Sequence, residues 1–206
     1  MAMQRIAHMR RELKQATAQL EEMNSLLQEQ ANEDSLTKLY NRRYIDQKLE
    51  TMIAWHGRHH MPMALILLDV DFFKPFNDNY GHIEGDRCLQ AIANQLKATF
   101  CRSGEYVGRY GGEEFVILLN STDAQTAERE AERIHEALYF LDYPHAYSSV
   151  ANRVTVSQGV FALQPTGKDK VADLYATADR ALYTSKSLGR NTYTCLLYTS
   201  DAADEW

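Results

Sequence analysis

The chain has 206 residues, 45% of them hydrophobic and 24% charged, which is typical of one globular domain with a short extension. Its net charge of −6 argues against nonspecific binding to nucleic acid, which favours basic surfaces. No apolar run reaches the roughly 18 residues of a membrane-spanning helix, and no signal peptide is recognisable. Three cysteines without metal-ligand spacing, Cys88, Cys101 and Cys195, favour a reducing, cytoplasmic location without a membrane anchor.

A heptad pattern predicts one helix over residues 3–31. Apolar side chains recur at the two seam positions of a coiled coil, at Ile6, Leu13, Leu20 and Leu27 in one seam and at Met9, Ala16 and Met23 in the other. We interpret residues 1–32 as a signalling helix that pairs with a second copy to form a homodimer. An amphipathic helix packed on its own domain is the alternative.

The next segment, residues 32–37, breaks the heptads, and Asp34 or Ser35 can cap the next structural element. Apolar spacing predicts a helix from Asn41 to about Trp55. The three histidines at positions 56, 59 and 60 are expected in a loop before the first core strand. We prefer the loop to a metal site, because no further ligands are apparent nearby.

Residues 63–71 form an apolar run that ends in two carboxylates, Asp69 and Asp71, and predict a strand buried on both faces. Farther along, Gly111 and Gly112 separate an extended segment from the apolar run 115–119. Adjacent glycines permit the tight turns of a β-hairpin and let a ligand approach the backbone.

Two acids, Glu113 and Glu114, open the outgoing strand of this hairpin and should point to opposite faces. If the first core strand lies beside the hairpin, Asp69 and Glu113 can share a divalent cation. Oxygen ligands favour Mg²⁺, with Mn²⁺ also possible, and the cation completes its shell with water and substrate phosphates. Such a site resembles that of nucleotide polymerases.

The segment after the strand predicts a short helix over residues 72–80 that ends at Gly81, and a long one from about Asp86 to Phe100. Backbone amides in the turn, together with Lys74, can hold triphosphate oxygens. Asn77 and a buried Asp86 are candidate readers of a base, because a carboxylate accepts the paired N–H donors of guanine. A helix cap is the alternative for Asp86.

The second half of the domain predicts a helix over 122–140, a strand over 153–161, a helix over 171–188 and then a short strand near Thr192. Lys186 and Arg190 are four residues apart and should project from one side of the last helix end, where two cations suit β- and γ-phosphates. A solvated basic face is the alternative. Residues 195–206 do not continue the pattern and look like a translated sequencing adapter, so we treat them as a non-native tail.

Several motifs in order carry a family resemblance. Gly-Gly-Glu-Glu-Phe at 111–115, the stretch Asp69–Asp86 and the opening motif Asp34–Arg43 resemble the GGDEF family of diguanylate cyclases over residues 33–194. Lys38 replaces the family's usual glycine. The resemblance implies an α+β fold like nucleotidyl cyclases and the polymerase palm, with a mostly antiparallel sheet and flanking helices.

The resemblance also implies roles for single residues. Main-chain groups of Phe72 and Phe73 would hold phosphates, and the carbonyl of Val70 would join the metal ligands. Asn77 and Asp86 would contact guanine. The remaining matches are Lys186 and Arg190, as phosphate ligands, and Arg102 with Glu105, as a possible inhibitory site in which the family usually has aspartate.

The implied reaction joins two GTP molecules into cyclic di-GMP and releases two pyrophosphates. It needs Mg²⁺ and two facing domains. Either Glu113 or a metal-lowered pKa of the attacking 3′-hydroxyl would provide the deprotonation, and Glu114 would bind a second metal or hold the turn. An inactive module that binds GTP or cyclic di-GMP as a sensor is the alternative, and a cyclase of mixed base preference is a third possibility, against which Asp86 argues.

Overall fold

The computed structural model describes residues 5, 8–11, 13–20, 23 and 32–198. The chain divides into two compact units, residues 1–33 and 34–206. In the first unit the described residues up to position 23 are helical, as the heptad pattern predicts. Its described seam side chains are 60% to 69% exposed: Met9, Leu13, Leu20 and Met23. The remaining seam positions, except Ala16, lie outside the described residues.

The second unit has eleven elements in the order β1 (Tyr40–Asn41), α2 (Arg42–His59), β2 (Met63–Val70), α3 (Phe73–Tyr80), α4 (His82–Thr99), β3 (Glu105–Gly111), β4 (Glu114–Asn120), α5 (Ala124–Leu141), β5 (Val156–Leu163), α6 (Val171–Ser187) and β6 (Tyr193–Tyr198). Apart from the two-residue β1, this is the predicted order. None of the described helices is both long and apolar enough to cross a bilayer.

One six-stranded sheet in the order β1-β3-β4-β2-β5-β6 forms the middle layer of the domain. The central strand β2 pairs antiparallel with β4 and with β5, while the edge strands β1 and β6 pair parallel with β3 and β5. The Asp69 strand therefore lies beside the glycine hairpin, as predicted, and the mostly antiparallel α+β sheet is confirmed.

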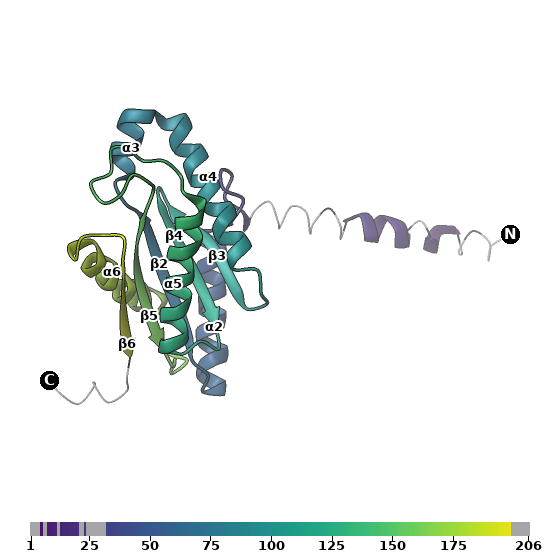
Figure 1. Ribbon diagram of the computed structural model, residues 1–206. Coiled ribbons are helices and arrows are strands. Elements are labelled where there is room, and N and C mark those ends of the chain that lie inside the picture. Colours follow the sequence, from purple (N-terminus) through teal and green to yellow (C-terminus); the bar gives the residue numbers. More distant parts are fainter. Residues whose placement is uncertain (1–4, 6–7, 12, 21–22, 24–31, 199–206) are drawn as a thin grey trace. The chain divides into compact units, whose positions relative to one another are not determined.

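The alternation of side chains along β2 builds two cores. Ala64, Ile66 and Leu68 pack with α4 and α5, which cover one face of the sheet in Figure 1. Met63, Leu65 and Leu67 pack with α2 and α6 on the opposite face. Because both faces of β2 are covered, the strand is a continuous apolar run rather than an alternating one.

The predicted end of the helix that begins near Asn41 was wrong. Helix α2 begins after Asn41, whose side chain accepts the Tyr44 N–H, and continues through the histidines to His59. His56 is therefore buried within a helix, where its ring nitrogens contact Met52 O and the Ser121 amide. Tertiary burial of a polar ring extends the helix where the sequence predicted a loop.

The last strand extends past the expected end of the domain. β6 includes residues 195–198, which sequence analysis had left out of the fold, and pairs them with β5 from Val160 to Leu163. Cys195 packs against the core. The assignment of 195–206 as a non-native tail stays a prediction, but its first four residues complete an edge strand.

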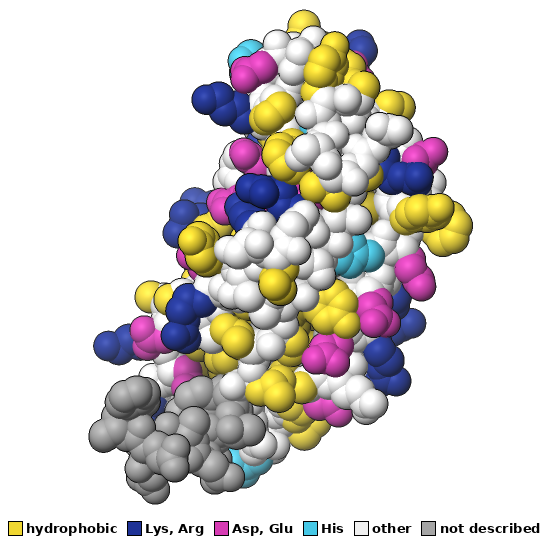
Figure 2. Space-filling view, turned by 60° about the vertical axis from the view of Figure 1, so that its left-hand side comes forward, with side chains coloured by type: hydrophobic (Ala, Val, Ile, Leu, Met, Phe, Trp, Pro, Cys, Tyr) yellow, Lys and Arg dark blue, Asp and Glu magenta, His cyan; other side chains and the backbone are white. Residues whose placement is uncertain are grey.

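Charges of both signs share the surface of the domain. On the face drawn in Figure 2, lysine and arginine side chains are interspersed with carboxylates and with apolar groups. This pattern, together with the net charge of −6, is that of an ordinary solvated surface rather than of a basic groove.

Candidate active site

The end of β2 brings Asp69 to the side of the sheet that α6 covers. Asp69 shares a face with the β2 side chains that pack on α2 and α6, because its position has the same parity. Lys186 of α6 meets it there, with 2.9 Å between Lys186 Nζ and Asp69 Oδ2. Burial raises the pKa of the Asp69 carboxyl; Lys186 opposes this shift, and the charges of Glu113 and Asp71 add to it.

The hairpin between β3 and β4 presents bare backbone next to this acid. Gly112 has a φ of 54°, a left-handed conformation that suits glycine. A Cβ added to Gly111 or Gly112 would have no neighbouring atom within 4 Å. The Glu113 carbonyl accepts the Val70 N–H at 3.3 Å, so the turn is attached directly to the end of β2.

The two acids of the hairpin take different positions from those expected. β4 begins at Glu114, which is the direct cross-strand partner of Asp69, whereas Glu113 lies in the turn. Burial raises the pKa of Glu114, and the charge of Asp69 raises it further. The charge of Glu113 also raises the pKa of Asp69 and of Glu114, so the three acids form one electrostatic neighbourhood.

The donor chemistry of this neighbourhood fits a hard divalent cation. Clusters of three or more His, Cys, Asp or Glu side chains able to hold a metal do not occur among the described residues. The predicted ligands are instead two carboxylates, Asp69 and Glu113, and the main-chain oxygen of Val70. That set suits Mg²⁺, which takes one or two protein carboxylates and fills its shell with water and phosphate oxygens.

The segment after β2 turns sharply into α3. Phe72 has a φ of 55° and precedes the helix, and the side chain of Phe73 is buried in the core. Phe73 can therefore offer a ligand only its main chain, as predicted from the resemblance. Lys74 is exposed in the first turn of the helix. This helix start is the expected phosphate-binding position.

The expected common helix face of Lys186 and Arg190 was wrong. α6 ends at Ser187, and Arg190 lies beyond it in a left-handed conformation with a φ of 67°. Its guanidinium carbon lies 4.7 Å from the centre of the Phe72 ring. The two cations thus reach the site separately, Lys186 at Asp69 and Arg190 at the turn after β2.

The predicted base-reading end lies where α3 meets α4. Asn77 Oδ1 is buried there without a hydrogen-bond partner. Gly85 packs on this amide so closely that a Cβ would lie 1.9 Å from Asn77 Oδ1. An orphaned acceptor of this kind is an expected feature of a site that recognises a donor on a ligand.

Asp86 is neither buried nor a helix cap, so both predictions for its position were wrong. α4 begins at His82, directly after Gly81, which also ends α3, so Asp86 is the fifth residue of the helix and cannot be its cap. Its side chain is exposed rather than buried. Any contact with a base would therefore be made by a solvated carboxylate, which discriminates less than a buried one.

The two residues of the candidate inhibitory site, Arg102 and Glu105, interact with one another. Glu105 accepts the Arg102 N–H at 2.9 Å, and its other oxygen lies 3.9 Å from the Arg102 guanidinium. The glutamate side chain is mostly buried and the arginine is exposed. The longer acid thus folds back on the turn at 102–105, and the arginine remains the accessible member of the pair.

Arg109 and Asp34 form a contact that holds the hairpin and that the sequence pattern did not predict. Arg109 Nε donates to the Gly112 carbonyl at 2.9 Å, and Arg109 Nη1 lies 3.2 Å from Asp34 Oδ1. Asp34 also accepts the N–H and hydroxyl of Thr37. Asp34 and Arg109 are 75 residues apart in sequence, so only the fold reveals that they meet.

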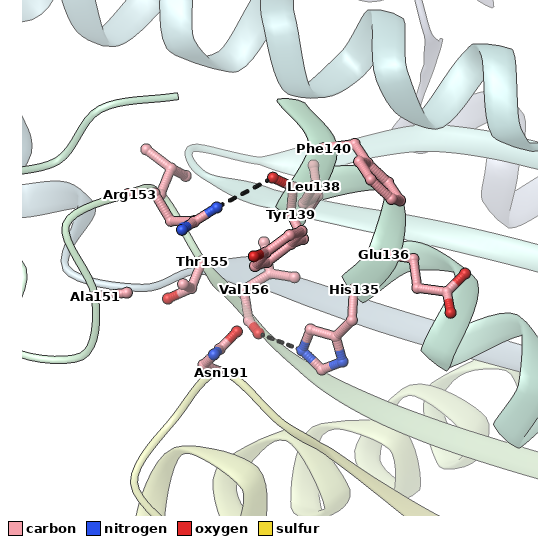
Figure 3. Close-up of a pocket in the computed structure, with 11 residues that line it drawn as sticks. His135, Glu136, Leu138, Tyr139, Phe140, Ala151, Arg153, Thr155, Val156 and Asn191 are labelled. Atoms are coloured by element: carbon pink, nitrogen blue, oxygen red, sulfur yellow. Dashed lines mark hydrogen bonds between the residues drawn. The ribbon is translucent and has the colours of Figure 1, made fainter. Parts of the chain in front are cut away.

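A cavity of about 680 Å³ lies away from the acids, between α5 and the start of β5. Figure 3 shows Arg153 stacked on Tyr139 at its rim and His135 directed at the Val156 carbonyl. None of the predicted site residues lines it. Thr155 and Asn191 do, and both contact Asp71 at the end of β2.

With this geometry established, comparison with known proteins identifies the family. A family model described as "Diguanylate cyclase, GGDEF domain" matches residues 31–192. This chain belongs to the GGDEF family. Diguanylate cyclase VdcA of Vibrio cholerae is 37% identical over 175 residues, which cover 84% of this chain and 50% of VdcA. The chain spans about half the length of the curated relatives it matches, at 46% of one and 50% of another.

Solved structures of GGDEF domains share the fold. The coiled coil and GGDEF domain of DgcB from Caulobacter crescentus, solved in complex with c-di-GMP, has a TM-score of 0.77 at 28% identity and covers 90% of this chain and 97% of its own. The active GGEEF domain of a Vibrio cholerae diguanylate cyclase has a TM-score of 0.64 at 32% identity, with coverages of 78% and 97%. These similarities confirm the predicted fold class.

Proposed function

We propose that the chain is a diguanylate cyclase that condenses two GTP molecules into cyclic di-GMP and two pyrophosphates. The observation that supports this most directly is the geometry at the β2 end. There Asp69 is the cross-strand partner of Glu114, and the Glu113 carbonyl accepts the Val70 N–H beside a bare glycine turn. Members of the family with the same domain are named as diguanylate cyclases.

Within this proposal each end of the site has a task. Asp69, Glu113 and the Val70 carbonyl would hold Mg²⁺ or Mn²⁺, which supplies charge neutralisation at the α-phosphate. Lys186 and Arg190, with the main chain at Phe72 and Phe73, would bind the β- and γ-phosphates. Glu113 lies in the glycine turn and is the proposed acceptor of the 3′-hydroxyl proton, while Glu114 would hold a second cation or the turn itself.

Guanine would lie where α3 meets α4. A guanine N–H donor would satisfy the buried Asn77 Oδ1, and the exposed Asp86 would accept from the same base edge. ATP presents no such paired donors, so we expect GTP to be preferred.

The product needs two half-sites, so the proposal includes a homodimer. The described seam positions of the N-terminal helix are exposed and apolar, which suits a coiled coil with a second copy. A helical tether of this kind raises the effective concentration of the second domain without new contacts at the site. The proposed location is the cytoplasm, where nucleoside triphosphates are found.

The possible inhibitory site is part of the same proposal. Arg102 is exposed and can form a fork on a phosphate of the product, but Glu105 is already turned back onto the Arg102 amide. Titration of cyclic di-GMP against activity tests it: Arg102→Ala should relieve inhibition, and activity that is unchanged at saturating product in the parent chain removes the inhibitory role.

The decisive experiment is incubation of the purified chain with GTP and MgCl₂, with the products separated by chromatography. We expect cyclic di-GMP and pyrophosphate, no product after chelation of the metal, and a fall of at least about 100-fold in Glu113→Gln, which keeps the side-chain shape and removes the charge. Equal turnover in both proteins would end the catalytic assignment. GTP binding without turnover in the parent chain would favour the sensor alternative.

A further inference from the structure

A buried carboxylate next to the site has no role in the proposed reaction. Asp71 follows β2 directly and is only 2% exposed. Its Oδ1 accepts the Ser157 hydroxyl at 2.6 Å, and its Oδ2 accepts the Thr155 hydroxyl at 2.8 Å and the Asn191 N–H at 3.0 Å. All three donors are neutral, so hydrogen bonds alone compensate for the loss of water around this side chain.

The Asn191 bond reaches a loop whose backbone is held in an unusual shape. Gly189, Arg190 and Asn191 have consecutive φ values of 110°, 67° and 48°. Residues other than glycine rarely adopt this left-handed region, and they persist there when the surrounding structure holds them. The Asp71 carboxylate accepts the N–H at the end of this run, and the Ser185 carbonyl accepts the Arg190 N–H at 3.1 Å.

The same carboxylate is covalently next to the other half of the proposed phosphate site. Phe72 follows Asp71 and is itself left-handed, with its carbonyl accepting a hydrogen bond from His145 Nε2 at 3.1 Å. The Arg190 guanidinium lies over the Phe72 ring. Asp71 therefore joins the turn after β2 to the loop after α6, and these segments carry the two kinds of proposed phosphate ligand.

Hydrogen bonds from Thr155 and Ser157, at the start of β5, fix the position of the Asp71 carboxylate. Thr155 and Ser157 hold one oxygen each, and the Thr155 carbonyl accepts the Asp71 N–H at 2.9 Å. Figure 3 shows Thr155, directly before β5, and Asn191, in the loop after α6, approaching one another.

We propose that Asp71 is a positioning residue for substrate phosphate: it holds the loop 189–191 against the turn after β2 and thereby presents Arg190 to the triphosphate. This inference rests on the proposed function, because it assumes that the site binds GTP. Asp71 acts through Arg190 and does not itself touch the nucleotide.

A double-mutant cycle on ligand affinity tests this inference. The chain of 206 residues is titrated by calorimetry in MgCl₂ with 3′-deoxy-GTP, which lacks the hydroxyl needed for condensation, and with GMP, which lacks the β- and γ-phosphates. We expect Asp71→Ala to weaken 3′-deoxy-GTP binding about tenfold, the size of one charge-assisted contact, and to leave GMP binding within about twofold. In an Arg190→Ala background the same change should cost no further affinity.

Two further variants separate positioning from folding. Asp71→Asn can still accept the Asn191 N–H and should retain nearly the parent affinity. Ser157→Ala removes the bond to Asp71 Oδ1 but leaves the Thr155 and Asn191 bonds to Oδ2. It should lower the melting temperature and change 3′-deoxy-GTP affinity by less than about twofold. If Asp71→Ala does not fold, Asp71→Ser, whose hydroxyl is too short to reach the loop, replaces it.

The possible outcomes discriminate between the two proposals. Equal losses in the parent and Arg190→Ala backgrounds, or equal losses for GMP and 3′-deoxy-GTP, would overturn the positioning role and leave the cyclase proposal standing. If the parent chain binds GMP and 3′-deoxy-GTP equally, or binds neither, the proposed function fails and the positioning role fails with it.

Discussion

The two ends of the candidate site differ in how their polar groups are satisfied. At the β2 end the charges already have partners within the protein: Asp69 pairs with Lys186, and Asp71 accepts three hydrogen bonds. At the α3–α4 end Asn77 Oδ1 is buried without a partner, and Asp86 is exposed to solvent.

This difference suggests that the two ends contribute differently, one to the rate of reaction and the other to the choice of base. Groups that are fixed before the ligand arrives stabilise developing charge without reorganising, which favours rate. A buried acceptor that lacks a partner gains one only from a ligand with a donor in the right place, which favours selectivity. We therefore expect changes to the proposed metal carboxylates at the β2 end to lower kcat, and changes at the α3–α4 end to alter base preference.

The largest expected effect is at Asp69. Asp69→Asn keeps the shape but removes one of the two predicted metal carboxylates, so kcat for cyclic di-GMP formation should fall at least about 100-fold. Asp78→Asn, an exposed acid on the neighbouring helix α3, is the matched control and should keep parent activity. Steady-state kinetics with GTP and MgCl₂ measure both. An Asp69→Asn protein that changes KM but not kcat would break the proposed division of tasks.

At the opposite end, Asn77→Ala should alter selectivity more than rate. The change removes the orphaned acceptor, so discrimination between GTP and ATP in kcat/KM should fall about tenfold or more, while the melting temperature stays equal or rises. Competition assays with both nucleotides and thermal unfolding measure the two effects.

Gly85→Ala provides an independent variant at the same place. Its new Cβ would lie 1.9 Å from Asn77 Oδ1, so the amide would have to move. Unchanged base preference in both variants would mean that guanine is read elsewhere.

Removing the partner of Asp69 at the β2 end sharpens the comparison. Lys186 is the cation that now pairs with Asp69, so it competes with a metal for that carboxylate. Lys186→Met should raise the affinity for Mn²⁺ without nucleotide about fivefold, the size of one part-buried ion pair, and should weaken GTP binding. A rise in Mn²⁺ affinity together with a fall in GTP affinity is expected only if Lys186 both competes with the metal for Asp69 and binds the nucleotide. Weaker binding of both ligands would contradict the competition.

Strong local signals made the centre of the site predictable from sequence. The glycine pair and the buried apolar run each determine an element type, and one antiparallel pairing brings their ends together. The parity of Asp69 then follows from the alternation along β2. Sequence alone could not show that Lys186 would be the partner on that face, because this depends on where α6 crosses the sheet.

The wrong predictions share a physical cause. Asp86 was placed at a helix start because Gly81 and Gly85 both suggested breaks, but Gly85 lies inside α4 where its missing side chain leaves room for Asn77. The α2 end was misplaced because a contact with Ser121 buries His56 inside a helix. In each case packing between separate elements outweighed local propensity, which is a weak guide on its own.

The smallest expected effect lies outside both ends, at the Asp34–Arg109 tie beneath the hairpin. Burial alone would raise the pKa of Asp34, but hydrogen bonds from Thr37 and Arg109 outweigh it and lower that pKa below its usual value. A carboxyl whose pKa is lowered by folding stabilises the protein above its unfolded pKa of about 3.9, and this stability is lost as the pH falls through the lower folded value. Asp34→Asn should therefore lower the melting temperature by about 2–4 °C at pH 7 and progressively less below about pH 4. Thermal unfolding across pH measures this. Asp169→Asn is the control, because this half-buried turn acid also accepts two bonds from a threonine, the N–H and hydroxyl of Thr166. A difference that stays constant down to pH 3 would show that the charge of Asp34 does not support the hairpin.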